Sequence, residues 1–195
     1  MKTDKKINSK RSNWKFDKNV ANSFDDHVKK SVPFYEISHE VIAGLSDFFL
    51  KENSVCYDLG SSTGILLDKL HKRHKGKKIK FIGLDNSLPM VKKAKKKFKK
   101  IKFLQGDVSK IKIKKNDLTL SLYTLQFIPP KKRQLLVNKI YNSLEWGGAF
   151  VLFEKIRGSD ARFQDILNFL YFDFKAKNGL SPSEILNKEI SLRGV

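Results

Sequence analysis

The sequence is poor in cysteine and has no long apolar runs. Its one cysteine among 195 residues, Cys56, excludes an internal disulfide and a multi-cysteine zinc site. No apolar run approaches the roughly 18 residues that a membrane helix needs. The first fifteen residues, MKTDKKINSKRSNWK, contain no apolar stretch of the kind that a secretory signal has. We therefore expect a protein of a reducing, cytoplasmic environment without a membrane partner.

Acidic residues are also scarce, since 20 Asp and Glu stand against 40 Lys and Arg and leave a net charge of +20. Such a charge is typical of proteins that bind nucleic acid. However, the basic runs are nearly all lysine, whereas arginine makes the planar contacts of base and phosphate readout. This pattern favours solvated surface faces with weak, nonspecific attraction to RNA. The runs are HKRHKGKKIK at 71–80, KKAKKKFKK at 92–100 and KIKIKK at 110–115.

The hydrophobic pattern predicts a basic, flexible segment over residues 1–15 and a single domain over residues 16–195. Apolar residues at helical spacing predict helices over 16–32 and 35–50. Strands and helices then alternate five times, which predicts an α/β fold with a mostly parallel sheet and helices on both faces. The predicted strands are 54–57, 78–84, 101–104, 117–123 and 149–154, the last after a turn at 146–148. The further helices are 65–74, 89–99, 133–144 and a helical region after 159 that is interrupted at 178–179.

Polar and small residues end the first three predicted strands, where such folds bind their ligands. Residues 58–64, DLGSSTG, form a glycine-rich loop that lets the backbone approach a ligand closely. Asp85 follows the second strand, where a carboxylate accepts from both hydroxyls of a ribose. Asp107 follows the third strand and can accept from an adenine amine. Each acid alone could be a helix cap, but three at successive strand ends predict a nucleoside site.

The glycine loop distinguishes between two nucleoside ligands. A dinucleotide fingerprint has two glycines separated by one residue, but Ser62 stands where the second of these should be. Asp58 lies two residues before Gly60, where it could hold an amino group. Both features favour S-adenosylmethionine over NAD. The histidines at 27, 39, 71 and 74 lack metal-ligand company, so we expect surface residues and no metal.

The order of these features resembles the class I S-adenosylmethionine-dependent methyltransferase fold, and more closely the carboxy-S-adenosyl-L-methionine synthase family. The resemblance runs from about Phe16 to the end of the chain. Its blocks are FDD (24–26), SVPFY (31–35), YDLGSS (57–62), DNSLPM (85–90), TLQF (124–127), RQLL (133–136), KIY (139–141), EKI (154–156), DFK (173–175) and NG (178–179).

The resemblance implies a specific reaction and its partners. The family converts S-adenosylmethionine and prephenate into carboxy-S-adenosylmethionine and phenylpyruvate, and the product serves the 5-oxyacetyl modification of a tRNA wobble uridine. It also implies a homodimer formed through the region after Ser159, with no need for direct tRNA binding. Catalytic residues stay unassigned, because prephenate's departing hydroxide serves as the base. The implied ligand contacts are Tyr35, which would close over the ligand, Gly60, Ser61, Ser62, Asp85, Asn86, Asp107 and Val108.

The sequence departs from the family at three places. Leu122 stands where the family has an asparagine, and Glu189 stands where it has a carboxylate-binding arginine. Arg193 lies four residues after Glu189, on the same face of a helix, and could replace that cation. The family continues beyond residue 195, so we expect the last strands of its sheet to be missing. Two alternatives therefore stay open: an ordinary methyltransferase, and a degenerate, non-catalytic RNA-binding domain.

Overall fold

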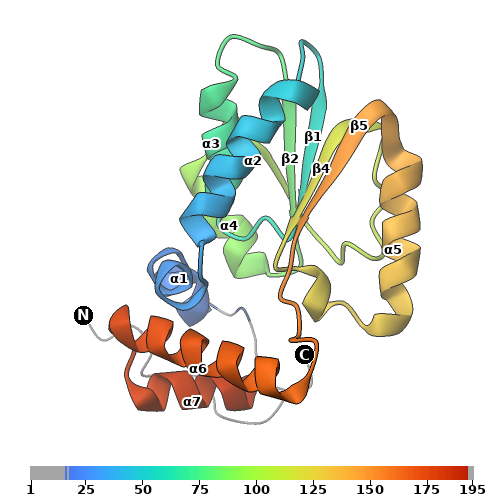
Figure 1. Ribbon diagram of the computed structural model, residues 1–195. Helices are drawn as coiled ribbons and strands as arrows, with labels where there is room; N and C mark the ends of the chain where they lie inside the picture. The colour runs from blue at the N-terminus through green and yellow to red at the C-terminus, as the bar shows by residue number, and fades with distance from the viewer. Residues whose placement is uncertain (1–15, 17, 193–195) are drawn as a thin grey trace. The chain divides into compact units, whose positions relative to one another are not determined.

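The computed structural model of the protein describes residue 16 and residues 18–192, and the chain divides into two compact units (Figure 1). Residues 37–154 form the first, which we call the sheet unit. The described residues of 1–36 and 155–195 form the second, the helical unit. The predicted flexible segment 1–15 lies outside the described residues. The single domain predicted over residues 16–195 stays a prediction.

The elements follow the predicted alternation of strands and helices. The strands are β1 (Val55–Leu59), β2 (Lys80–Asp85), β3 (Lys102–Gln105), β4 (Asn116–Leu122) and β5 (Leu144–Phe153). The helices are α1 (Lys18–Ser31), α2 (Tyr35–Phe49), α3 (Ile65–Arg73), α4 (Leu88–Lys97), α5 (Pro130–Ser143), α6 (Ala161–Lys177) and α7 (Pro182–Ser191), with a 3-10 turn η1 (Leu125–Phe127). None of these helices is both long and apolar enough to cross a membrane.

The five strands form one parallel sheet in the order β3-β2-β1-β4-β5. The chain builds outward from β1 to β3 on one side and from β4 to β5 on the other. The direction of winding therefore reverses between β1 and β4. In open parallel sheets, ligands bind at the carboxyl ends of the strands beside such a reversal. The sheet thus places the loops after β1 and β4 at the position where a ligand is expected.

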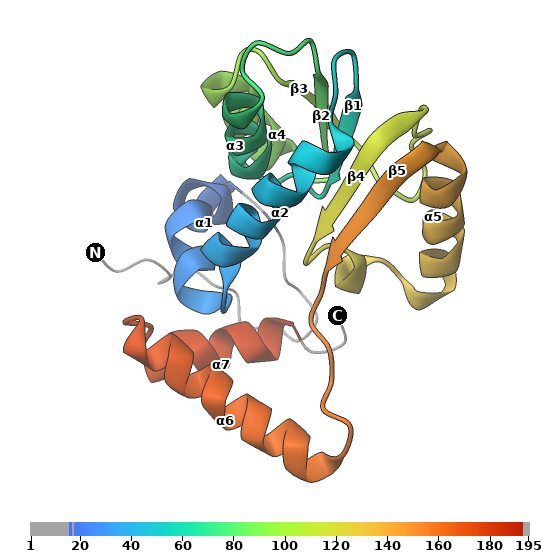
Figure 2. The same cartoon turned by 45° about the horizontal axis from the view of Figure 1, so that its top comes forward.

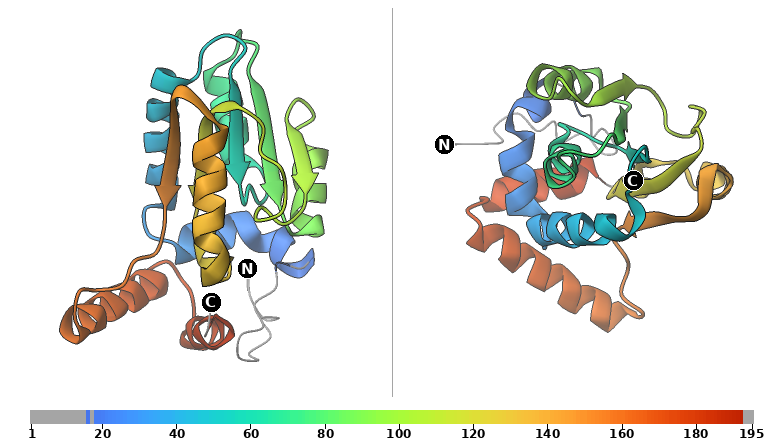
Figure 3. Two further views of the ribbon diagram at one scale, coloured as in Figure 1. Left: turned by 90° about the vertical axis from the view of Figure 1, so that its right-hand side faces the viewer. Right: turned by 90° about the horizontal axis from the view of Figure 1, so that it is seen from above.

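Helices cover both faces of the sheet, with α2, α3 and α4 on one face and α5 on the other (Figures 2 and 3). Successive strand side chains point to opposite faces, so Cys56 joins the core under α2 to α4 while Tyr57 joins the core under α5. The first core, which we call the α2-side core, also contains Ile42, Leu67, Val91, Phe103, Leu118 and Leu120. The second contains Leu59, Leu84, Val108, Ile113, Leu136 and Ile140. The predicted parallel sheet with helices on both faces is confirmed.

Short polar residues set where several helices begin. Ser87 caps α4 by accepting from the Met90 backbone N–H at 3.4 Å. Ser181 and Glu184 form a reciprocal capping box at α7. Such caps satisfy backbone donors that would otherwise lack a partner at a helix start. The α4 cap matters for function, because it sets the chain direction immediately after Asp85.

The turn predicted over residues 146–148 is wrong, because these residues lie within β5, which begins at Leu144. The register shows how this occurs: Asn116 pairs with Leu144 and Leu118 pairs with Ala149, so three extra residues are accommodated on β5. Gly147 has a φ of +79° there. The turn-forming residues thus make a bulge inside a strand, which residue type alone does not distinguish from a turn.

Side-chain contacts join the helices of the helical unit. Lys188 on α7 lies 2.6 Å from the His27 ring and 2.9 Å from Ser31 Oγ, both on α1. Lys175 on α6 donates to Glu189 on α7 at 2.7 Å. These contacts pair residues far apart in the sequence, so the two ends of the chain form one unit.

Candidate functional site

The loop after β1 adopts a conformation that requires glycine. Gly60 has a φ of +83°, and a Cβ atom at this position would overlap the side chain of Thr124, which follows β4. The backbone N–H groups of Gly60 and Ser61 both donate to the carbonyl of Leu84, at 2.7 and 2.9 Å. The loop is therefore fixed against the ends of β2 and β4, with its backbone closely packed at the winding reversal.

Asp85, the last residue of β2, links two loops through its carboxylate. Oδ2 accepts from the Ser62 backbone N–H and Oδ1 from the Ser87 backbone N–H, both at 2.8 Å. Burial raises the pKa of Asp85, and these two hydrogen bonds only partly oppose it. Each carboxylate oxygen can accept more than one hydrogen bond, so the arrangement leaves acceptor capacity for a ribose diol.

Asp58, on β1, is the second carboxyl of the site and is only 3% exposed, whereas Asp85 is partly buried. Burial raises its pKa to about 7, with a further contribution from the charge of Asp85. A nearby cation stabilises the ionised form of carboxyls whose pKa values are raised in this way. The pair is therefore suited to a ligand that carries positive charge.

The predicted contacts at the third strand lie beside Asp85. The N–H of Gly106 donates to the Asp85 carbonyl at 2.9 Å, which places the loop after β3 against the end of β2. Asp107 Oδ1 accepts from both the backbone and the hydroxyl of Ser109, at 2.8 and 2.7 Å, and these bonds lower its pKa. Asn86 is exposed, and the Val108 side chain is buried in the second core. A ligand would thus meet the Asp107 carboxylate in its charged form.

Two features of the site were not found from the sequence. Tyr123 follows β4 with a φ of +51°, an unusual value for a residue with a bulky side chain. Thr124, next to it, packs against Gly60 and donates to the Leu122 carbonyl at 3.0 Å. In the sequence, Thr124 is identified only as part of the TLQF block, and its contact with Gly60 is not predicted. Residue type does not predict a positive φ for a tyrosine.

Other predicted contacts differ in how the structure places them. Ser61 Oγ is buried without a hydrogen-bond partner among the described residues, as expected of a group that a ligand or water would satisfy. Ser62 has a φ of +50° and donates through Oγ to the Met90 sulfur at 3.6 Å. Tyr35 begins α2 and is grouped with the helical unit, so its closure over the ligand stays a prediction.

The departures from the family have structural counterparts. Leu122 packs against the α2-side core. Glu189 pairs with Lys175, whose side chain is 0% exposed and whose Nζ lies 3.7 Å from the Tyr171 ring centroid. Burial lowers the pKa of Lys175, while Glu189 opposes that shift. The charge of Glu189 is thus offset within the helical unit. Arg193 lies outside the described residues.

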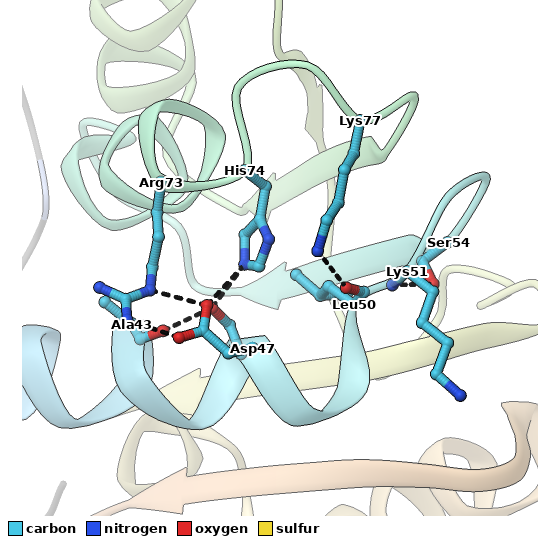
Figure 4. Close-up of polar contacts among 9 residues, drawn as sticks. Ala43, Asp47, Leu50, Lys51, Ser54, Arg73, His74 and Lys77 are labelled. Carbon is cyan, nitrogen blue, oxygen red and sulfur yellow. Dashed lines mark hydrogen bonds and ion pairs between the residues drawn. The ribbon is translucent and has the colours of Figure 1, made fainter.

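The prediction that the histidines lie at the surface is wrong for His27, His39 and His74, which are all buried. Figure 4 shows the reason for His74, which turns inward toward α2: its Nε2 lies 2.8 Å from the hydroxyl of Ser46. A hydrogen-bonded imidazole can be buried at little cost. In the described part of the chain, no three His, Cys, Asp or Glu side chains gather as a metal site would require.

The sheet order, the glycine loop at the winding reversal and the acid after β2 together define a class I methyltransferase. A methyltransferase-domain family model matches residues 56–148, which run from β1 to the first part of β5 and include the glycine loop and Asp85. A solved TehB-like S-adenosylmethionine-dependent methyltransferase from Corynebacterium glutamicum has the same fold, with a TM-score of 0.57 at 21% identity over 84% of this chain and 82% of that one.

Closer relatives identify the family. The chain is 39% identical to the carboxy-S-adenosyl-L-methionine synthase of Staphylococcus epidermidis over 185 residues, which cover 93% of this chain and 81% of the relative. It is 37% identical to the synthase of a Shewanella species, strain ANA-3, over 94% of this chain and 78% of the relative. The chain belongs to the carboxy-S-adenosyl-L-methionine synthase family.

Proposed function

We propose that this protein binds S-adenosyl-L-methionine and converts it, with prephenate, into carboxy-S-adenosyl-L-methionine. The observation that carries the proposal is Asp85, whose carboxylate joins the loops after β1 and β2 and retains acceptor capacity where we expect the ribose. The relatives named as carboxy-S-adenosyl-L-methionine synthases support this product, and prephenate as the second substrate follows from the family resemblance. The product would serve the modification of a tRNA wobble uridine.

The charges of the site fit this ligand. S-Adenosyl-L-methionine carries a sulfonium and an ammonium group, and the site contains the buried carboxyl of Asp58, whose pKa is raised by burial and by the charge of Asp85. A ligand cation beside Asp58 would favour its ionised form and gain a charge-assisted hydrogen bond. The glycine loop and the orphaned hydroxyl of Ser61 lie beside the same strand ends. The residues present therefore fit the ligand.

The proposed chemistry does not require a protein side chain to act as the base. Prephenate loses its ring carboxylate as CO2 and its hydroxide as the ring becomes aromatic. The hydroxide removes a proton from the sulfonium methyl group to give water, and the resulting ylide carbon forms a bond to CO2. The products are phenylpyruvate, water and carboxy-S-adenosyl-L-methionine. The protein must hold the reactants in contact and exclude bulk water.

The experiment is an incubation of the purified protein with S-adenosyl-L-methionine and prephenate, followed by mass spectrometry of the nucleosides. We expect the carboxylated nucleoside to appear only when prephenate is present. The Asp85→Ala variant should form less product at limiting S-adenosyl-L-methionine, whereas the Asp165→Ala variant, altered at an exposed carboxylate of α6, should match the wild type. Failure of the wild type to form the product would contradict the proposal.

A second candidate, an ordinary methyltransferase, is favoured by one observation. Glu189 occupies the position of the family's carboxylate-binding arginine and is paired with Lys175, so this pair presents no free cation to a product carboxylate. The same incubation with bulk tRNA in place of prephenate tests this candidate. Formation of S-adenosylhomocysteine with tRNA, together with no carboxylated nucleoside in the incubation with prephenate, would favour the ordinary methyltransferase.

A further inference from the structure

Tyr123 has an unusual position in the sheet unit. Regular alternation along β4 directs Leu118, Leu120 and Leu122 into the α2-side core, so the next residue should point to the opposite face. Instead, its φ of +51° breaks the strand geometry, and its phenol hydrogen-bonds with Ser38 on α2. The left-handed backbone thus brings the phenol to the face that carries α2.

This conformation is held in place by its neighbours. The Tyr123 backbone N–H donates to the Phe153 carbonyl at 2.7 Å, and its carbonyl accepts from the Gln126 side chain at 3.1 Å. A non-glycine residue with positive φ costs about 1–3 kcal/mol, and such strain concentrates at ligand-binding positions. The strain therefore points to a role for the Tyr123 side chain at this strand end.

The strand order indicates which part of the ligand Tyr123 would meet. Asp107 and Asp85 place the base and the ribose at β3 and β2, and β1 and β4 follow in that order along the carboxyl edge. The ligand that extends from its ribose toward β4 therefore brings its amino-acid end and sulfonium substituents to the end of β4. Leu59 and Leu84, the sequence neighbours of Asp58 and Asp85, point into the second core. Asp58 and Asp85 therefore point to the opposite face of the sheet, which carries the α2-side core.

We propose that the Tyr123 phenol donates a hydrogen bond to the amino-acid carboxylate of the bound nucleoside. This inference rests on the proposed function and adds a specificity-determining residue to it. The phenol supplies a neutral donor beside Leu122, which has no polar group to offer. An ammonium or guanidinium is not required for such a contact, because one hydrogen bond from a neutral donor to a carboxylate contributes measurable affinity.

The charges around the phenol are compatible with this role. Burial raises the pKa of Tyr123, with Ser38 opposing the shift and the charge of Glu154 adding to it, so the phenol keeps its proton at neutral pH. Glu154 itself accepts from the Gln126 backbone N–H at 3.2 Å. The amino-acid end of the ligand presents both an ammonium group and a carboxylate. Asp58 would accept from the ammonium group, and the Tyr123 phenol would donate to the carboxylate.

The test compares ligands that differ only at this end. Titration calorimetry with the Tyr123→Phe variant should show S-adenosyl-L-methionine binding weakened about tenfold or more, the range for a hydrogen bond to a charged group. Binding of 5′-methylthioadenosine, which lacks the amino-acid end, should be unchanged. The matched control is Tyr141→Phe, because Tyr141 lies on α5 and is 77% exposed; this variant should bind both ligands as the wild type does.

Each other result has a defined meaning. Unchanged S-adenosyl-L-methionine binding, or equal weakening of both ligands, would overturn the assignment, since equal weakening indicates a structural role only. Carboxy-S-adenosyl-L-methionine is a third ligand with the same amino-acid carboxylate, so an equal loss of affinity for it supports the assignment and an unchanged affinity contradicts it. A wild type that binds 5′-methylthioadenosine but not S-adenosyl-L-methionine contradicts the proposed function itself, and the Tyr123 assignment with it.

A rescue variant provides a second measurement. The family has an asparagine at position 122, so the double variant Leu122→Asn/Tyr123→Phe restores a polar donor at the same strand end. We expect it to regain part of the S-adenosyl-L-methionine affinity that Tyr123→Phe loses. No regain, in a variant that still binds 5′-methylthioadenosine, would contradict a donor role at this strand end.

Discussion

The sheet unit contains two polar clusters at opposite ends of its strands, and their carboxylates are in opposite electrostatic states. Before the starts of β1 and β2, Arg73 forms two hydrogen bonds to Asp47, at 2.8 and 2.5 Å, and lowers its pKa (Figure 4). After the ends of the same strands, burial raises the pKa values of Asp58 and Asp85. Both clusters are made of ordinary charged residues on neighbouring elements.

The difference shows how to distinguish a structural cluster from a binding one. Asp47 has a cationic partner from this chain, and the cluster around it also satisfies backbone groups, such as the Leu50 carbonyl that accepts from Lys77 at 3.2 Å. Asp85 accepts from the backbone N–H groups of Ser62 and Ser87, and the charge of Asp85 is the neighbouring charge that acts on Asp58. Ionisable groups held in such unfavourable states concentrate at functional sites. The predictions below test this contrast.

The largest expected effect follows from Gly60→Ala. The new Cβ would overlap Thr124 in a backbone with positive φ, so we expect the free energy of unfolding to fall by about 2–5 kcal/mol and ligand binding to be lost. The control is Gly44→Ala in α2, where a Cβ meets nothing within 4 Å. This change should stabilise the protein by about 0.5–1 kcal/mol. Urea unfolding measures both, and equal effects would contradict the close packing of the loop.

The next effect concerns ligand affinity at the binding cluster. Asp85→Ala should weaken S-adenosyl-L-methionine binding by about 1.5–3 kcal/mol, the range for charge-assisted hydrogen bonds. Isothermal titration calorimetry measures the change, with Asp165→Ala as the control. An unchanged affinity in a folded Asp85→Ala protein would remove the ribose assignment.

The raised pKa of Asp58 should make the free energy of unfolding depend on pH. Its folded pKa of about 7 lies above the unfolded value of about 4, so the folded state retains the proton more strongly between these pH values. The contribution of Asp58 to stability therefore falls as pH rises from about 4 to 7. Relative to the wild type, Asp58→Asn should gain about 1 kcal/mol or more of stability between pH 5 and pH 8 in the absence of ligand. Parallel stability curves in urea unfolding would contradict the raised pKa.

The smallest effect is expected at the structural cluster. Asp47→Asn removes an exposed ion pair with Arg73, and such pairs contribute little and are screened by salt. We expect a slight loss of thermal stability that disappears at high salt, with unchanged S-adenosyl-L-methionine affinity. A loss of affinity would mean that the two clusters are coupled.

Much of the fold could be predicted because its signals are local. Helical spacing and apolar strand runs indicated each element of the sheet, and the alternation of strands and helices implied parallel pairing. The ends of predicted strands indicated Asp85 and Asp107; Asp85 ends β2, and Asp107 follows the end of the adjacent strand β3, where Gln105 pairs with Asp85. The β5 bulge at Gly147 and the buried His74 could not be predicted, because each depends on a partner distant in the sequence.

The sequence by itself determined the class of fold, the glycine loop and the acids at the strand ends, because these follow from periodicity and from the position of each residue after a strand. Only the tertiary structure decided that Gly60 lies against Thr124, that Asp58 is buried beside Asp85, and that Tyr123 turns toward α2. Each of these depends on side chains that meet across the sheet, where burial and backbone strain set their chemistry.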